Sequence, residues 1–249
     1  MIRYAILGPV ALCDGERRVA AAGRRQVGLL ALLLVNANRT VSSDRLIDAV
    51  WGDLAPAGAL KRLQVAIVRL RRTLERQGVP SESVLRTVAG GYVLEVRPGE
   101  LDAELFETRV GDARGALASG DPAGARDRLI EALGLWRGPA LAEVTYEQFA
   151  QPEIRRLEEL RLVALETRVD CELQLGEHVR VIGELDALVA AHPGRERLIG
   201  QLMLALYRCG RQADALDVFT RTRRYLSGEL GLEPGPALRA LQAEILAQS

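Results

Sequence analysis

The segment from Ala57 to Gln77 constrains the fold more than any other part of this chain, because two faces recur in it at helical spacing. Its apolar positions form one stripe, as in a helix that packs against a core: Leu63, Ile67, Leu70 and Leu74. A nearly opposite face consists of Arg62, Val65, Arg69, Arg72 and Arg76, bordered by Lys61, Gln64 and Val68. We therefore expect a surface helix with a basic edge, ended by Gly78.

The residues before this helix are expected to form a small antiparallel sheet and two helices. A strand and a hairpin are expected within residues 2–19, because Asp14-Gly15 supplies the positive φ angles of a tight hairpin turn. One helix is expected at 24–35, since its leucines recur on one side. A second helix follows a cap at Ser42 or Ser43 and ends at Trp51-Gly52.

The residues after the basic helix predict a second hairpin. Val84 to Val88 and Tyr92 to Val96 are strand-like runs joined by Ala89-Gly90-Gly91, and Arg86 lies at the edge of this hairpin. A sheet, three helices and a hairpin in this order are typical of a winged helix-turn-helix. The third helix would be the recognition helix for the DNA major groove, and the hairpin would be the wing.

The basic edge of the third helix has the chemistry of a nucleic-acid contact. Arginines can donate to guanine or to phosphate oxygens. Gln64 can pair with adenine or a phosphate, and Val65 can meet a thymine methyl group. A solvated arginine face remains the alternative on periodicity alone, because arginine is the usual basic residue throughout this chain.

The charge of the chain is divided between two unlike segments. The 33 basic and 33 acidic residues cancel over all 249 residues. Residues 1–98, however, hold 15 basic and 8 acidic residues, which is a surplus of seven positive charges. Residues 99–249 carry a surplus of seven negative charges, which cancels it. This asymmetry predicts one segment that meets an anionic partner and one that does not.

Several function classes are excluded by residue usage. The only lysine, Lys61, has no glycine-rich loop before it, so a phosphate-binding loop is absent. The three cysteines lie far apart, and no nucleophile, base and acid set accompanies the two histidines. We therefore expect no enzyme, no metal and no cofactor. A signal peptide and an apolar membrane span are also missing, which predicts a cytoplasmic, nucleoid-associated protein without a membrane partner.

The acidic segment reads as a series of helices with an internal repeat. Leu175-Gly176-Glu177 and Cys209-Gly210-Arg211 are 34 residues apart, which is the tetratricopeptide period, and a similar break lies at Gly120. Such arrays present a concave surface to proteins. The predicted fold is thus mostly α with small β: a winged helix-turn-helix domain at 1–98 and an all-α, tetratricopeptide-like helical repeat domain at 99–249.

Several stretches, taken together in this order, resemble a known family. They are 46–52, 63–65 with 69–72, 90–92, 101–102 with 106–107, 132–138 and 230–234. The first segment resembles the OmpR-like winged-helix DNA-binding domain, which is also the effector domain of two-component regulators. The second segment is similar to the bacterial transcriptional activation domain. Together they resemble the Streptomyces antibiotic regulatory proteins over nearly the whole chain.

The resemblance implies a sequence-specific activator of a secondary-metabolite (antibiotic) biosynthesis gene cluster. Such an activator binds tandem direct repeats upstream of promoters, with two protomers side by side on double-stranded DNA, and recruits RNA polymerase and its sigma factor. The positions that match the DNA-contacting helix and wing are Lys61, Arg62, Val65, Arg69, Arg71, Arg72, Arg86 and Thr87. Those that match a polymerase-contact loop are Gly52, Asp53, Leu54, Ala55 and Pro56.

The sequence departs from the family pattern at two positions. Ala66 and Leu60 stand where relatives often carry polar or basic residues. Larger relatives append an ATPase region, and the phosphate-binding lysine of such a region is absent here. An alternative function also stays open: a helical-repeat interaction regulator whose winged helix binds a protein rather than DNA.

Overall fold

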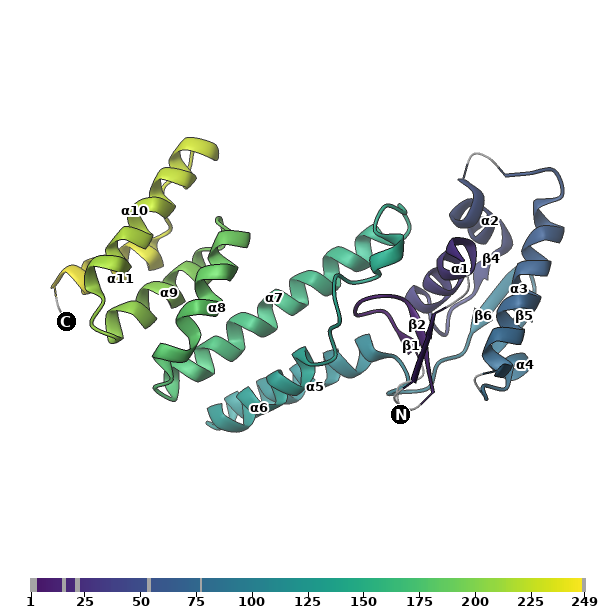
Figure 1. Cartoon of the computed structure of the whole chain (residues 1–249), viewed down its shortest axis with the longest axis horizontal. Coiled ribbons are helices and arrows are strands. Elements are labelled where there is room, and N and C mark those ends of the chain that lie inside the picture. The colour runs from purple at the N-terminus through teal and green to yellow at the C-terminus, as the bar shows by residue number, and fades with distance from the viewer. Residues whose placement is uncertain (1–3, 15–16, 21–22, 53–54, 77, 248–249) are drawn as a thin grey trace. The chain divides into compact units, whose positions relative to one another are not determined.

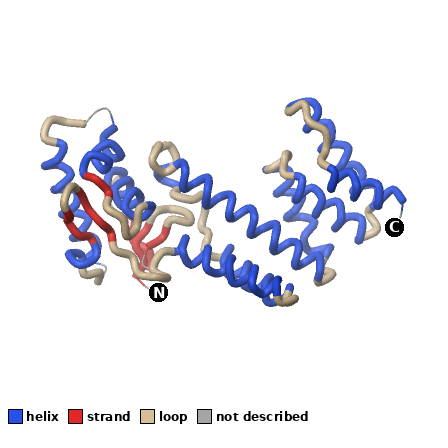
Figure 2. The backbone as a smooth tube through the Cα atoms, turned by 180° about the vertical axis from the view of Figure 1, so that it is seen from behind, coloured by secondary structure: helices blue, strands red, loops and turns tan. Residues whose placement is uncertain are grey.

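The computed structural model describes residues 4–14, 17–20, 23–52, 55–76 and 78–247 (Figure 1). The chain divides into two compact units, one formed by Met1–Gly111 with Glu131–Leu162 and the other by Asp112–Ile130 with Val163–Ser249. Helices dominate, and the strands of the described residues lie in the N-terminal part of the chain (Figure 2). The expected fold class, mostly α with small β, is confirmed.

The first sheet consists of β1 (Tyr4–Ala5), β2 (Ala11–Asp14) and β3 (Arg17–Ala20), which pair antiparallel in that order. This confirms the expected sheet. Residues 1–3 of the expected first strand, and the glycine of the expected Asp14-Gly15 turn, lie outside the described residues.

A hydrogen-bonded seam joins the segment after β1 to residues 137–143 of the same unit. The amide of Arg137 donates to the Leu7 carbonyl at 2.8 Å, and the amide of Leu141 donates to the Ile6 carbonyl at 2.9 Å. The amide of Val10 donates to the Glu143 carboxylate at 2.8 Å. The backbone groups between β1 and β2 are therefore satisfied by residues more than 125 positions later in the chain.

Three helices follow the first sheet: α1 (Arg24–Val35), α2 (Ser43–Trp51) and α3 (Ala59–Arg76). Ser42 is the cap of α2, since its hydroxyl accepts from the amide of Arg45 at 3.2 Å. Gly52 ends α2 at a φ of 56°, which favours glycine. The apolar stripe expected for the third helix is buried in full: Leu63, Ile67, Leu70 and Leu74.

The second sheet contains one strand more than expected. The hairpin of β5 (Leu85–Val88) and β6 (Gly91–Leu94) is confirmed, and β4 (Val41–Ser42) pairs with the free edge of β6. A Cβ at Gly91 would collide with the carbonyl of Val41, so glycine lets the two strands approach. A short helix, α4 (Ser81–Val84), precedes β5 and was not expected.

The remaining elements are helical. They are α5 (Asp102–Ala118), α6 (Pro122–Leu133), the short 3-10 helix η2 (Ala142–Val144), α7 (Gln151–Gln174), α8 (His178–Ala191), α9 (Glu196–Arg208), α10 (Gln212–Glu229) and α11 (Pro236–Ala247). None of the helices in the described residues is both long and apolar enough to cross a membrane.

The second unit contains the repeated turn that the sequence predicted. Gly120, Gly176 and Gly210 have φ angles of 79°, 82° and 76°. In each turn the amide after the glycine donates to the carbonyl five residues earlier, as in the Glu177 to Glu172 bond of 2.9 Å and the Arg211 to Leu206 bond of 2.9 Å. The same local backbone geometry therefore joins the two helices of each pair: α5 to α6, α7 to α8 and α9 to α10.

Candidate nucleic-acid interface

The exposed side of α3 carries most of the residues that the sequence predicts as nucleic-acid contacts. Burial of the leucine stripe fixes the rotation of the helix, so the opposite side faces solvent. Six nominated side chains are exposed there: Lys61, Arg62, Gln64, Val65, Arg69 and Arg72. Within the described part of the chain, none of these cations forms an ion pair with a carboxylate. The row is thus free to meet an anionic partner.

Arg71 behaves differently from the other arginines of α3. Its guanidinium is half-buried and donates to the Leu85 carbonyl from Nε at 3.0 Å and from Nη2 at 2.8 Å. Nη2 also donates to the Thr87 hydroxyl at 2.9 Å. Arg71 therefore ties α3 to β5, the first strand of the hairpin.

The wing presents one nominated cation that already has a partner. Arg86 and Thr87 of β5 are both exposed. Nη1 of Arg86 lies 2.6 Å from Oε1 of Glu95, which follows β6. Because this ion pair is half-exposed on both sides, it is weak and exchangeable. A phosphate could therefore replace the carboxylate of Glu95 as the partner of Arg86.

The nominated polymerase-contact loop is only partly described. Gly52 and Ala55 are exposed and Pro56 is half-exposed. Asp53 and Leu54 lie outside the described residues. The structure thus places the two ends of this loop at the surface, between α2 and α3.

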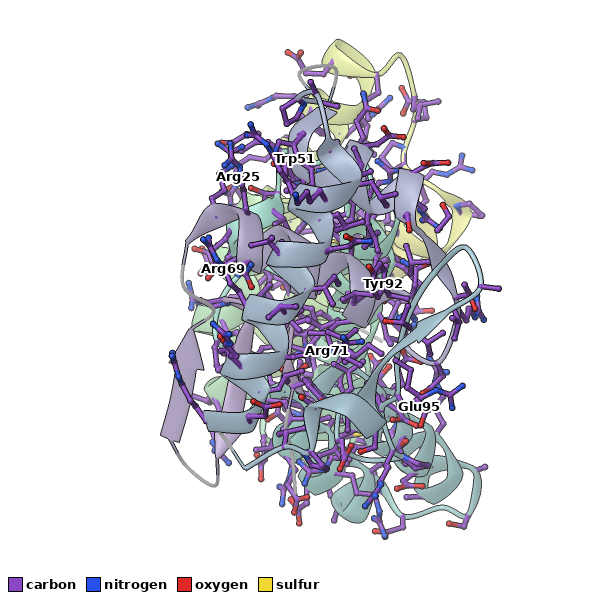
Figure 3. The ribbon with its side chains drawn as sticks, turned by 90° about the vertical axis from the view of Figure 1, so that its right-hand side faces the viewer. Arg25, Trp51, Arg69, Arg71, Tyr92 and Glu95 are labelled. Carbon is purple, nitrogen blue, oxygen red and sulfur yellow. The ribbon has the colours of Figure 1, made fainter. Side chains whose placement is uncertain are left out.

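A groove of about 810 Å³ lies beside α3 and was missed by sequence reasoning. The start of α1, the end of α2 and one side of α3 form its walls, and Arg25, Trp51 and Arg69 line it (Figure 3). Nε2 of Gln26 donates to the Ala66 carbonyl at 3.1 Å, which joins α1 to α3. The adjacent Arg24-Arg25 pair was a signal of positive charge in the sequence, but its proximity to α3 arises only from tertiary packing.

Metal chemistry has no support in the described residues. No group of three or more histidine, cysteine, aspartate or glutamate side chains there could hold a metal ion. Cys13 and Cys171 are buried cysteines, and burial raises the pKa of Cys171. Burial has the opposite effect on the pKa of His178, which it lowers, because the charged form of histidine is the protonated one. Cys13 belongs to the first unit, whereas Cys171 and His178 belong to the second.

Two family models match successive parts of the chain. The transcriptional regulatory protein C-terminal family matches residues 17–94, and the bacterial transcriptional activator domain matches residues 101–246. The first match covers β3, the four helices α1 to α4 and the second sheet. The second match covers α5 to α11.

Similar whole proteins are regulators. The chain is 38% identical to the regulatory protein DnrI of Streptomyces peucetius, over 97% of this chain and 90% of DnrI. It is 45% identical to the regulatory protein AfsR of Streptomyces coelicolor over 98% of this chain, but spans only about a quarter, 24%, of that protein. A solved structure, EmbR of Mycobacterium tuberculosis in complex with a low-affinity phosphopeptide, matches with a TM-score of 0.94 and 34% identity, over 100% of this chain and 65% of EmbR.

These matches agree with the order of elements in the structure. A winged helix with an exposed basic recognition helix precedes a series of helix pairs with a repeated turn. The family model of the activator domain covers more than half of the chain, and DnrI is matched over nearly its full length. The chain therefore belongs to the Streptomyces antibiotic regulatory protein family, whose members are transcriptional regulators and not enzymes.

Proposed function

We propose that this chain is a sequence-specific, DNA-binding activator of a secondary-metabolite gene cluster. The observation that carries the proposal is the row of exposed, unpaired cations on α3, backed by a fully buried leucine stripe. A rigid helix with such an edge fits the major groove of DNA, where arginine can donate to guanine and to phosphates.

The proposed contacts divide into base-reading and backbone-binding groups. Gln64, Val65, Arg69 and Arg72 lie on the outward side of α3 and would read base edges. Lys61 and Arg62, in the first turn of the helix, would bind phosphates. Arg86 and Thr87 would extend the contact through the wing, toward the backbone or the minor groove. Arg71 would act by holding the wing against α3.

The proposal extends to the assembly on a promoter. Two protomers would bind tandem direct repeats side by side, and the loop from Gly52 to Pro56 would contact RNA polymerase or its sigma factor. Residues 1–98 would supply the DNA contact, and residues 99–249, with their surplus of negative charge, would remain free for proteins. This work would take place at the nucleoid, in the cytoplasm.

The test is a binding titration of the whole chain against fragments from the intergenic regions of its own gene cluster, at several salt concentrations. The logarithm of the affinity should fall linearly with the logarithm of the salt concentration. Arg69→Ala should cost about 1–3 kcal/mol and relax specificity if Arg69 reads a base. Arg239→Ala removes an exposed arginine of α11 and should leave binding unchanged. Absence of salt-dependent binding to every fragment would contradict the proposal.

A second candidate function rests on apolar exposure along the same helix. Leu60, Val65 and Val68 expose 52%, 48% and 43% of their surface. Such side chains on α3 also suit a protein contact, in which the winged helix binds polymerase or another regulator instead of DNA. Binding of purified host RNA polymerase that Val68→Asp abolishes, without binding to any DNA fragment, would favour this function over the first.

A further inference from the structure

We propose that the groove between α1, α2 and α3 binds a small aromatic anion that also carries a hydrogen-bond donor, and that this ligand competes with DNA. The competition rests on the proposed function, whereas the binding itself does not. The volume of about 810 Å³ lies within the range of small-molecule sites, roughly 300–1,000 Å³.

The floor of the groove is apolar. It is lined by Trp51 at the end of α2, by Ala57 in the turn before α3, and by Val65 and Ala66 in the middle of α3. Flat aromatic and small aliphatic groups of this kind suit a planar ring, since ring faces and methyl groups can cover both its sides. The floor thus selects for an aromatic body.

The rim of the groove is cationic. It is lined by Arg25, Lys61, Arg62 and Arg69, and no acidic side chain among the described residues lines it. Arg24 also belongs to the lining, but its guanidinium is 3.1 Å from the carboxylate of Glu147. Four cations without a carboxylate partner in the described residues create a positive field over an apolar floor. A ligand therefore needs an acidic group as well as a ring.

Two buried polar atoms among the lining residues have no hydrogen-bond partner within the described part of the chain. They are Nε1 of Trp51, which can only donate, and Oε1 of Gln26, which can only accept. The orientation of the Gln26 amide is set by the bond from its Nε2 to the Ala66 carbonyl. Unsatisfied buried groups of this kind call for partners that a ligand can supply.

These two atoms discriminate between a ligand and the DNA backbone. A phosphate of DNA offers acceptor oxygens, which would satisfy Trp51 but leave Oε1 of Gln26 without a donor. A molecule with an acid at one end and a hydroxyl or amine at the other satisfies both. Such a molecule would also contact Lys61, Arg62 and Arg69, which are proposed to contact DNA. Binding of the ligand and binding of DNA would therefore exclude each other.

The experiment titrates 6-hydroxy-2-naphthoate into the whole chain without DNA, followed by calorimetry and by tryptophan fluorescence. We expect saturable binding that quenches Trp51, while Trp51→Phe leaves the signal of Trp136 unquenched. Two analogues test the two ends of the ligand. 2-Naphthoate lacks the hydroxyl and 2-naphthol lacks the acid, and each should bind about tenfold more weakly.

Variants locate the site. Arg25→Gln removes a rim cation that is not among the proposed DNA contacts, and Ala66→Leu fills the floor; each should weaken binding about tenfold. The matched controls Arg39→Gln and Val179→Leu alter exposed residues outside the groove and should bind as the original chain does. No saturable binding, equal binding by controls and groove variants, or equal binding of inorganic phosphate would overturn the proposal.

Competition is measured separately by adding 6-hydroxy-2-naphthoate to a chain–DNA complex at constant ionic strength. Release of DNA at the concentrations that fill the groove supports exclusion, and an undisturbed ternary complex overturns that half of the proposal. If the chain binds no DNA at all, the proposed function fails, but the direct titration still decides whether the groove is a ligand site.

Discussion

Nη2 of Arg71 lies 2.9 Å from the hydroxyl oxygen of Thr87, and with the two bonds to the Leu85 carbonyl it joins α3 to β5. The helix and the wing would approach different parts of one DNA site. One planar guanidinium therefore contributes three hydrogen bonds to holding their relative position, and a lysine cannot reproduce its fork geometry.

Arg71→Lys should loosen the wing without unfolding the chain. A lysine keeps the charge but cannot make all three hydrogen bonds, and bonds from a charged group contribute about 1.5–3 kcal/mol. We expect the free energy of unfolding to fall by about 1–2 kcal/mol, measured by urea denaturation. The control is Arg72→Lys, because Arg72 is exposed and should change stability by less than about 0.5 kcal/mol. Equal stability of the two variants would contradict the role of Arg71.

Asp102→Ala should destabilise the first unit strongly. The carboxylate of Asp102 is buried, accepts from the amides of Ile6 at 2.8 Å and Leu7 at 3.2 Å, and lies 2.6 Å from Nη2 of Arg137. Its loss leaves two buried amides and a charge without a partner, which costs about 3–5 kcal/mol. The loss of stability is measured by thermal unfolding of Asp102→Ala and of the control Asp186→Ala, which alters an exposed aspartate of α8. A cost as small as that of the control would show that water replaces the carboxylate.

The same carboxyl predicts a pH dependence of stability. Burial raises the pKa of Asp102 above its ordinary value of 3.8, and this outweighs the amides of Ile6 and Leu7 and the charge of Arg137, which lower it. The folded state therefore holds this proton more tightly than the unfolded state does. Its contribution to stability is fully present below about pH 4 and is lost as the pH rises through the folded pKa.

Asp102→Asn removes this titration and isolates its effect. The free energy of unfolding of the original chain minus that of Asp102→Asn should decrease between pH 4 and pH 7, in urea titrations at constant ionic strength. The double variant with Arg137→Met serves as the control for the partner charge. A difference that increases with pH would mean that Arg137 and the amides outweigh burial.

Gly91→Ala should disrupt the pairing of β4 with β6. The added Cβ would meet the carbonyl oxygen of Val41, a backbone atom that cannot rotate away. We expect a loss of about 1–3 kcal/mol, as for an overpacked site. Gly115→Ala is the matched control, since nothing lies within 4 Å of a Cβ there and α5 should gain about 0.5–1 kcal/mol. Hydrogen exchange at the amides of β6 would localise the effect, and unchanged protection in Gly91→Ala would contradict it.

Elements with strong local signals were predictable from the sequence. The helix expected at 24–35 spans Arg24–Val35 in the structure, because its leucine run and the asparagines after it are local features. The buried stripe of α3 followed from its spacing alone. β4 was missed because a strand of two residues carries no alternation, and it exists only through its pairing with β6.

The site was predictable in its charges but not in its contacts. The helical period placed Lys61, Arg62 and Arg69 on an open face, and they are exposed. It could not indicate that Arg71, one position after the buried Leu70, would turn to Leu85 and Thr87. The groove beside α3 needs three helices brought together by packing, which no spacing within one segment reveals.

The seam between residues 6–10 and 137–143 bears on how this regulator can be cut or recombined. A fragment that stops after the wing keeps α3 but lacks residues 137–143. In that fragment the carbonyls of Ile6 and Leu7 lose their donors, and the amide of Val10 loses its acceptor. An exchange of winged-helix segments between relatives at that point would mismatch these groups in the same way. Specificity in such chimaeras should transfer cleanly only when the 137–143 segment travels with the winged helix that it was built to cover.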